Sequence, residues 1–214
     1  MIPVHFLEAV AVAATRAPGP RTIPWPMPGN PGGFVQFEDY AQWQKFLLAF
    51  DLPPSVAGVV TDAFDRARKT FMLSWVDFDL AVIGEMAALS ALELAVRDRY
   101  QAVEVCRRQT KLVEKTRRQN RAATLRENEE TKRVSFAYLL KMMVDLDGLT
   151  DEKIPLVRRT GGSVVGRLTA ESVPTLADIR NVRAHGNPFG SGFEAGLLEL
   201  VRDLIAYAYR ESIA

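Results

Sequence analysis

The sequence predicts an all-α protein. Apolar residues recur every three to four positions over most of the chain, which is the period of an amphipathic helix, and no alternating apolar and polar runs flank a hairpin turn. The 214 residues, of which 48% are hydrophobic and 25% are charged, suffice for one buried core or for one core with an extension. We therefore expect helices packed around a single core.

The first 50 residues are predicted to form an N-terminal arm and a short helix. Residues 17–33 contain six prolines and four glycines. Proline lacks the amide hydrogen that a regular helix or a central strand needs, so we expect a linker or an irregular surface arm here. A short amphipathic helix then runs from Glu38 to Phe50. The first 14 residues are rich in apolar side chains, but Glu8 interrupts them and no basic segment precedes them, which argues against a signal peptide.

Two amphipathic helices are predicted between residues 51 and 100. Pro53 and Pro54 separate the first of them from the preceding segment, and apolar residues spaced by three and four then continue to Trp75. The second helix begins near Asp77 and is rich in alanine and leucine, the best helix formers. The predicted core positions are Val56, Val59, Val60, Ala63, Phe64, Ala67, Phe71 and Trp75 in the first helix and Leu80, Ile83, Ala87, Ala91, Leu94 and Ala95 in the second.

Residues 101–133 are predicted to continue the helix as a long polar extension of a domain that spans residues 51–214. Between Arg107 and Arg133 the sequence has ten basic and four acidic residues, and neither proline nor glycine interrupts it. One interpretation is a solvated helical face, and the other is a patch that binds the phosphate backbone of a nucleic acid. The RNA-binding candidates in this stretch are Arg107, Arg108, Lys111, Arg117, Arg118 and Arg121.

Three further helices are predicted in the C-terminal part. The first is an apolar helix over Val134–Leu146, which ends at Gly148. A long connection over residues 150–174 follows. The second helix runs from about Pro174 to His185. The last helix opens with S-x-x-E, the spacing of a capping box, from Ser191 to Glu194.

The composition excludes several classes of site. With one cysteine and two histidines, the chain can form neither an intrachain disulfide, nor a cysteine-based zinc cluster, nor a three-histidine metal site, so we expect no metal and no cofactor. A net charge of +1 excludes a globally basic nucleic-acid binder, although a local basic patch remains open. Because no apolar run reaches about 18 residues, no membrane-spanning helix is expected, and the single cysteine favours the cytoplasm.

Three other features have ordinary explanations. The glycine-rich stretch Gly161–Gly166 has the spacing of a phosphate-binding loop, but Arg167 and Leu168 stand where that motif requires lysine and serine or threonine. We interpret it as a surface loop. Cys106 and His5 have no catalytic partner close in sequence, and we interpret both as incidental.

The most informative segment spans residues 176–188. Arg180, Asn181, Arg183 and His185 gather on the last turn and a half of a short predicted helix, which stops at Gly-Asn-Pro. Arginine presents donors that match a phosphate, and a histidine near the negative end of a helix suits proton transfer near neutral pH. The alternative is that His185 only caps its own helix and that Arg180 forms an ion pair. The predicted buried side of the helix consists of Leu176, Ile179 and Val182.

The pattern R-N-x-x-x-H at Arg180 to His185 resembles the R-polar-x-x-x-H signature of the HEPN superfamily. The motif ends a short penultimate helix, and an amphipathic helix follows it, as in that superfamily. The pattern A-L-E-L-A-V-R at Ala91 to Arg97 is similar to the second core helix of HEPN proteins. The resemblance covers residues from about Pro53 to Tyr100 and from Val134 to Glu211.

The resemblance implies an antiparallel helical bundle that dimerises with its two motif helices facing each other. In active members, paired arginines and histidines form a metal-independent ribonuclease site, in which a 2′-hydroxyl of RNA attacks the adjacent phosphate. Arg180 would then stabilise the transition state, His185 would act as general acid or base, and Asn181 would orient the histidine or the phosphate. Arg183 would join the basic extension in binding RNA, and Glu93 is a further accessory candidate.

The resemblance also implies a toxin or phage-defence role, with an antitoxin protein as a partner. In some toxins of this superfamily a tyrosine stands two residues after the histidine, where this chain has Asn187. Because not all HEPN domains cut RNA, two alternatives stay open. One is a non-catalytic module that binds RNA or a partner protein, and the other is an α-helical dimeric scaffold.

Overall fold

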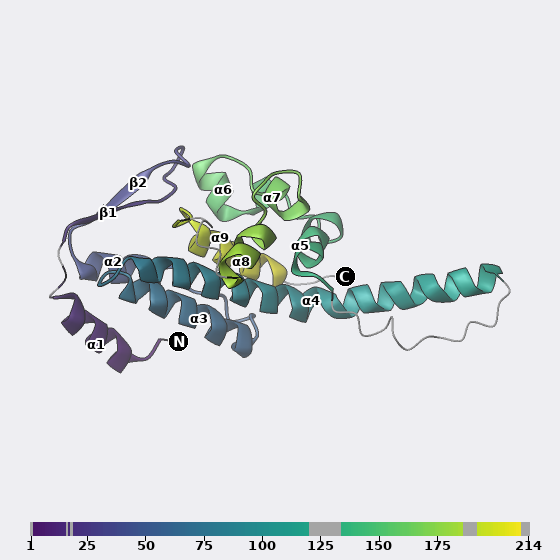
Figure 1. Cartoon of the computed structure of the whole chain (residues 1–214), viewed down its shortest axis with the longest axis horizontal. Coiled ribbons are helices and arrows are strands. Elements are labelled where there is room, and N and C mark those ends of the chain that lie inside the picture. The colour runs from purple at the N-terminus through teal and green to yellow at the C-terminus, as the bar shows by residue number, and fades with distance from the viewer. Residues whose placement is uncertain (1, 16, 18, 120–133, 186–191, 211–214) are drawn as a thin grey trace.

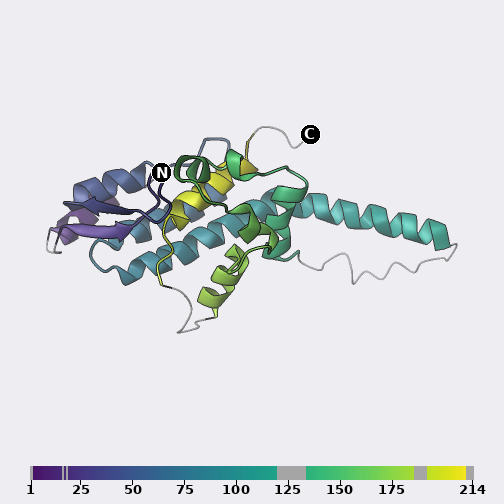
Figure 2. The same cartoon turned by 90° about the horizontal axis from the view of Figure 1, so that it is seen from above.

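The computed structural model is mostly helical and describes residues 2–15, 17, 19–119, 134–185 and 192–210. Its helices pack as a bundle, with a small antiparallel hairpin at one end and a long helix that projects from the other (Figure 1, Figure 2). In chain order the elements are α1 (Val4–Ala14), β1 (Arg21–Pro24), β2 (Phe34–Phe37), α2 (Tyr40–Leu48), α3 (Gly58–Leu73), α4 (Asp79–Gln119), α5 (Phe136–Asp145), the 3-10 turn η1 (Asp151–Lys153), α6 (Pro155–Thr160), α7 (Val165–Thr169), α8 (Leu176–Ala184) and α9 (Leu197–Ala208).

Helices α3, α4 and α9 form the centre of the bundle. α3 lies beside the first half of α4 in both views, and α9 packs against the same half of α4 (Figure 1, Figure 2). Phe64 and Phe71 of α3, Leu92 of α4 and Leu204 of α9 are fully buried. α5 and α8 also pack against α4. The predicted helical bundle is therefore confirmed.

α4 is buried over a wider arc than a single apolar face. Ala88, Leu89 and Leu92, which the one-face interpretation leaves out, are fully buried. Conversely, Ile83 of α4 is 50% exposed and Val59 of α3 is 60% exposed, so their prediction as core residues is wrong. For α4 the physical reason is that α3, α5, α8 and α9 all contact it, so its buried residues lie on several faces and not along one stripe.

The prediction of an irregular surface arm over residues 17–33 is wrong in part, and the all-α prediction is wrong for this segment. β1 and β2 pair antiparallel, with Arg21 opposite Phe37 and Pro24 opposite Phe34. A two-stranded sheet tolerates this proline because each strand has a free edge, where no amide hydrogen is needed. The next residue, Trp25, is 1% exposed and anchors the hairpin in the core.

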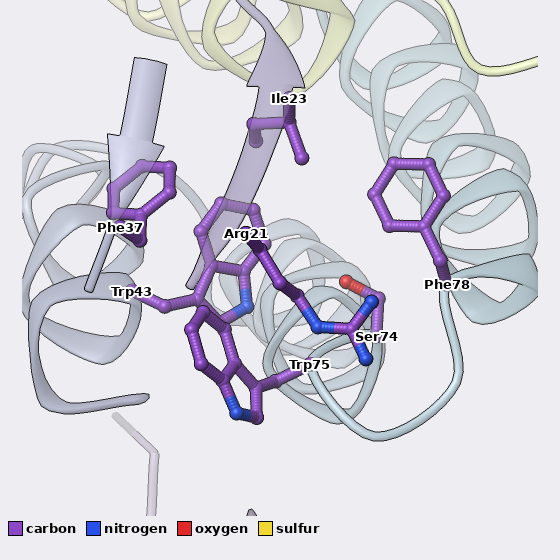
Figure 3. Close-up of a pocket in the computed structure, with 7 residues that line it drawn as sticks. All are labelled: Arg21, Ile23, Phe37, Trp43, Ser74, Trp75 and Phe78. Carbon is purple, nitrogen blue, oxygen red and sulfur yellow. The ribbon is translucent and has the colours of Figure 1, made fainter. Parts of the chain in front are cut away.

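Aromatic side chains pack between the hairpin and the neighbouring helices. Figure 3 shows Arg21 of β1 among rings that come from β2, α2 and the connection between α3 and α4. The guanidinium carbon of Arg21 lies 5.6 Å from the ring centre of Trp75, and the ring centres of Phe37 and Trp43 are 5.0 Å apart. The space between these side chains is a cavity of about 10 Å³, at the lower limit for one water molecule.

The predicted polar extension is a continuation of α4. This helix has 41 residues, and its second half projects from the bundle as far as Gln119 (Figure 1). The predicted stretch over 101–133 is thus helical up to that residue, and its remainder lies outside the described residues. Among the helices that the structure describes, none is long and apolar enough to cross a membrane.

The C-terminal part contains more regular structure than the sequence predicted. The connection over residues 150–174 includes η1, α6 and α7. α8 spans Leu176–Ala184, as predicted. The last helix starts later than predicted, because α9 begins at Leu197, after Gly196 in a left-handed conformation with a φ of 76°.

Candidate functional site

The motif helix α8 has a well-defined start. Thr175 and Asp178 form a reciprocal capping box, in which each backbone N–H donates to the other residue's side-chain oxygen over 3.0 Å. The hydrogen bonds from Thr175 hold the pKa of Asp178 below its ordinary value. Leu176 and Ile179 are buried, as predicted, whereas Val182 is only half-buried. These contacts set the rotation of α8 and hence the direction in which its polar side chains point.

Arg180 is held at the surface by an acidic residue of α4. Its Nη2 lies 2.8 Å from Oε2 of Glu93, and its Nη1 donates to Oδ1 of Asn181 over 3.2 Å. The side chain of Arg180 keeps 32% of its surface exposed. It is therefore oriented by two protein contacts while it stays accessible to a ligand.

Glu93 links this arginine to the point where the basic extension leaves the bundle. Its Oε1 accepts from Nε and Nη2 of Arg97 over 3.2 and 2.7 Å. Arg97 in turn donates from Nη1 to the backbone carbonyl of Val134 over 3.1 Å. Glu93 is 15% exposed at its side chain, so both of its ion pairs are partly shielded from water.

Asn181 and His185 lie at the exposed end of α8. His185 is the C-cap residue, and its backbone N–H donates to the carbonyl of Asn181 over 3.0 Å. Both side chains are exposed. Because residues four apart lie on the same helix face, Asn181 and His185 are neighbours, next to Arg180. Arg180 therefore contacts Asn181, and the C-cap His185 follows Asn181 one turn later at the end of the helix.

Arg183 does not join them. Its side chain is 3% exposed and its Nη2 lies 2.6 Å from Oε2 of Glu85, a residue of α4 that is fully buried. Glu85 Oε1 accepts a hydrogen bond from the backbone N–H of Glu194 over 2.7 Å. In this conformation Arg183 points into the bundle, away from any surface at which RNA could bind.

Glu85 is the residue near this site that the sequence analysis missed. Burial raises the pKa of Glu85, while the guanidinium of Arg183 and the amide of Glu194 oppose the rise by stabilising the carboxylate. A signal was present in the sequence, because a carboxylate within an apolar helical run predicts a buried cationic partner. The sequence did not indicate which of the many arginines that partner would be.

The basic candidates of the extension lie away from the motif. Arg107 is exposed and follows Arg97 by ten residues, which corresponds to about 15 Å along α4. Arg108, Lys111, Arg117 and Arg118 lie further along the same helix, and Arg121 lies outside the described residues.

The glycine-rich stretch before α7 has its loop amides already occupied. The backbone N–H groups of Val164 and Val165 donate to Oδ1 of Asp151 over 2.8 and 3.1 Å. A carboxylate thus takes the place that a phosphate would need, which supports the interpretation as a surface loop. Among the residues that the structure describes, no group of three or more potential ligands gathers as a metal site.

The end of α8 offers a guanidinium that can bind a phosphate, an amide that can orient it and an imidazole that can exchange a proton. Comparisons with protein-family models, with curated proteins and with solved structures found no match for this chain. A function therefore has to be argued from this chemistry.

Proposed function

We propose that the protein is a metal-independent endoribonuclease of the HEPN type, which cleaves single-stranded RNA. The observation that supports the proposal is that Asn181 and His185 are exposed at the end of α8, where the partly exposed Arg180 is oriented by Glu93 over 2.8 Å. Phosphate binding and proton transfer are the two capacities that cleavage by a neighbouring hydroxyl requires. A toxin or phage-defence role, with an antitoxin protein as partner, follows from the resemblance to HEPN proteins.

The proposed reaction needs one base and one acid. The base takes the proton of the 2′-hydroxyl, whose oxygen bonds to phosphorus while the bond from phosphorus to the 5′-oxygen of the next nucleotide breaks. The acid gives a proton to that leaving oxygen. The products are a 2′,3′-cyclic phosphate and a 5′-hydroxyl. Arg180 stabilises the additional negative charge on the phosphate oxygens in the transition state.

A dimer would supply both proton-transferring groups. The chain has two histidines, and the second, His5, belongs to α1 rather than to the motif helix. We propose that a second copy of the chain places its own motif beside the first, so that two histidines and two arginines share one site. The exposure of this end of α8 supports that arrangement.

The test is cleavage of a fluorescent single-stranded RNA in EDTA by the purified chain. We expect His185→Gln to lower the rate by about 100-fold or more, because general acid–base catalysis contributes that much. Arg180→Ala should lower it by a similar factor. His5→Gln and Arg66→Ala change exposed residues of the same type outside the site, and both should cleave at the wild-type rate. Equal cleavage by the wild type and His185→Gln would exclude His185 as a catalytic residue.

A second candidate is a non-catalytic module that binds RNA through the basic extension. The observation in its favour is the projection of α4 from the bundle, which presents a basic stretch away from the core (Figure 1). This candidate predicts RNA binding that weakens with salt but shows no turnover. A dimeric scaffold without RNA affinity would show neither property.

A further inference from the structure

A buried ion pair joins α8 to α4 directly behind the candidate site. The Nη2 atom of Arg183 lies 2.6 Å from Oε2 of Glu85, and the two side chains are 3% and 0% exposed. Arg183 precedes His185 by two residues, so its side chain points to the interior while the polar motif faces outward. This pair is among the least exposed ion pairs in the described part of the chain.

The same two side chains also hold the segment that leads into α9. Arg183 Nη2 donates to the backbone carbonyl of Gly192 over 3.2 Å, and Glu85 Oε1 accepts from the N–H of Glu194 over 2.7 Å. Glu194 is fixed further by Arg167, whose Nη1 lies 2.8 Å from its Oε1. The pair therefore connects α4, the end of α8 and the approach to α9.

Stability alone does not account for such a pair. Moving two charges out of water is costly, and apolar residues of similar volume often replace a buried pair with no loss of stability. Breaking the pair by removing one partner is different, because it leaves an uncompensated charge in the interior. A pair with directional hydrogen bonds to two backbone groups, however, sets the position of a helix end more closely than apolar contacts do.

We propose that Arg183 is a positioning residue, which acts through Glu85 to fix the end of α8, and with it His185, against α4. In this role Arg183 contacts groups in the protein interior and does not bind RNA. The inference deepens the proposed ribonuclease function and rests on it for its catalytic consequence. Its structural part, the placement of the His185 ring, can be measured whether or not the protein cleaves RNA.

The test is the double variant Glu85→Gln with Arg183→Met, which removes both charges and keeps the side-chain volumes similar. We expect its midpoint of urea unfolding to stay near that of the wild type. Its kcat for RNA cleavage should fall by about 10- to 100-fold with KM changed less than about twofold, because a small displacement of a catalytic group lowers the rate without weakening binding.

The matched control is the pair Asp65 and Arg68 of α3. These side chains are 6% and 4% exposed and lie 2.8 Å apart, and Arg68 also donates to the carbonyls of Leu47 and Leu48 at the end of α2. Asp65→Asn with Arg68→Met should leave kcat unchanged at equal folded fraction. The NMR signals of the His185 ring should shift in the Glu85 and Arg183 double variant and stay in place in this control.

If the first double variant does not fold, Arg183→Lys replaces it. Lysine keeps the charge but cannot contact Glu85 and the Gly192 carbonyl with one planar group, so kcat should still fall several-fold. Wild-type kcat or, for a chain without ribonuclease activity, unshifted His185 signals would overturn the positioning role. Shifted signals without any RNA cleavage by the wild type would support positioning and reject the ribonuclease function alone.

Discussion

The two carboxylate oxygens of Glu93 in α4 contact two different arginines, and Oε2 lies 2.8 Å from Nη2 of Arg180 in α8. The other oxygen holds Arg97, which also binds the carbonyl of Val134. The arginine that we propose to contact the phosphate is thus oriented before RNA arrives. Preorganisation of this kind lowers the cost of arranging charge in the transition state.

We expect Glu93→Gln to lower kcat about tenfold, because the amide no longer pairs with the charge of Arg180 and the guanidinium gains freedom. RNA affinity should stay equal or rise slightly, since a negative charge near the phosphate has been removed. Steady-state cleavage kinetics separate the two effects. Glu171→Gln, an exposed change outside the site, is the control. An unchanged kcat for Glu93→Gln would show that this ion pair does not serve the reaction.

The basic extension is expected to bind the phosphate backbone of RNA. Reversing three charges with Arg117→Glu, Arg118→Glu and Arg121→Glu should weaken binding and reduce the slope of log affinity against log salt by about two. Fluorescence anisotropy at several salt concentrations measures both. The control is the pair Arg66→Glu and Arg158→Glu, which reverses exposed charges on the bundle. Equal affinity of the triple variant and the wild type would identify the extension as a solvated face.

The position of the motif on α8 was predictable because the start and the buried side of a helix depend on nearby residues. The capping box and the buried Leu176 and Ile179 place Arg180 and His185 near the end of α8. The orientation of the Arg180 guanidinium was not predictable in this way, because it depends on Glu93 of α4. Arg183 shows the limit of this reasoning. Its direction depends on Glu85, which lies 98 residues earlier in the sequence and meets it only in the folded bundle.

The fold was predictable where one helix packs on one neighbour and not where several converge. Ile83 fits an apolar stripe, yet it is 50% exposed because the helices around α4 leave that side open. The prediction for the segment that forms the hairpin was wrong for another reason. Six prolines in residues 17–33 argue against regular structure, but Trp25 finds long-range partners that outweigh this local preference.

Trp25 is expected to anchor the hairpin energetically. It is 1% exposed, stacks on Phe50 with ring centres 5.6 Å apart, and donates from Nε1 to Oε2 of Glu199 over 3.1 Å. Trp25→Ala should lower the free energy of unfolding by about 3–5 kcal/mol, because it leaves a cavity among the aromatic rings of the core. Phe34→Ala, at a position 66% exposed in the same hairpin, should change it by less than about 0.5 kcal/mol. Urea unfolding compares the two, and similar losses would contradict the anchoring role of Trp25.

Asp203 is expected to make stability depend on pH. Burial raises its pKa from 3.8 to about 6, against the opposing effects of Arg202 and of the N–H of Leu156. A carboxyl group with a raised pKa binds its proton more tightly in the folded state. Its contribution to stability is therefore complete below pH 3.8 and is lost as the pH rises through 6.

Asp203→Asn removes this titration. Relative to the variant, the wild type should lose roughly 2–3 kcal/mol of unfolding free energy between pH 4 and pH 7. Urea unfolding at several pH values measures the difference, and Asp145→Asn, at a half-exposed carboxyl of α5, is the control. If the free energies of unfolding of the wild type and Asp203→Asn change in parallel with pH, the raised pKa of Asp203 is contradicted.

A site shared between two copies has a consequence that independent sites lack. If acid and base are the His185 residues of two subunits, one defective subunit disables the whole site. A purified heterodimer of the wild type with His185→Gln should then retain about 1% of wild-type activity or less. If each chain instead formed a complete site of its own, the same heterodimer would retain about half of the wild-type activity. Differently tagged subunits allow the heterodimer to be isolated, and native mass spectrometry confirms its composition.

The control is the heterodimer of the wild type with His5→Gln. It should keep full activity, which shows that tagging and subunit exchange do not impair the protein. Retention of half the activity with His185→Gln would reject the shared site and leave each chain to supply both proton-transferring groups itself.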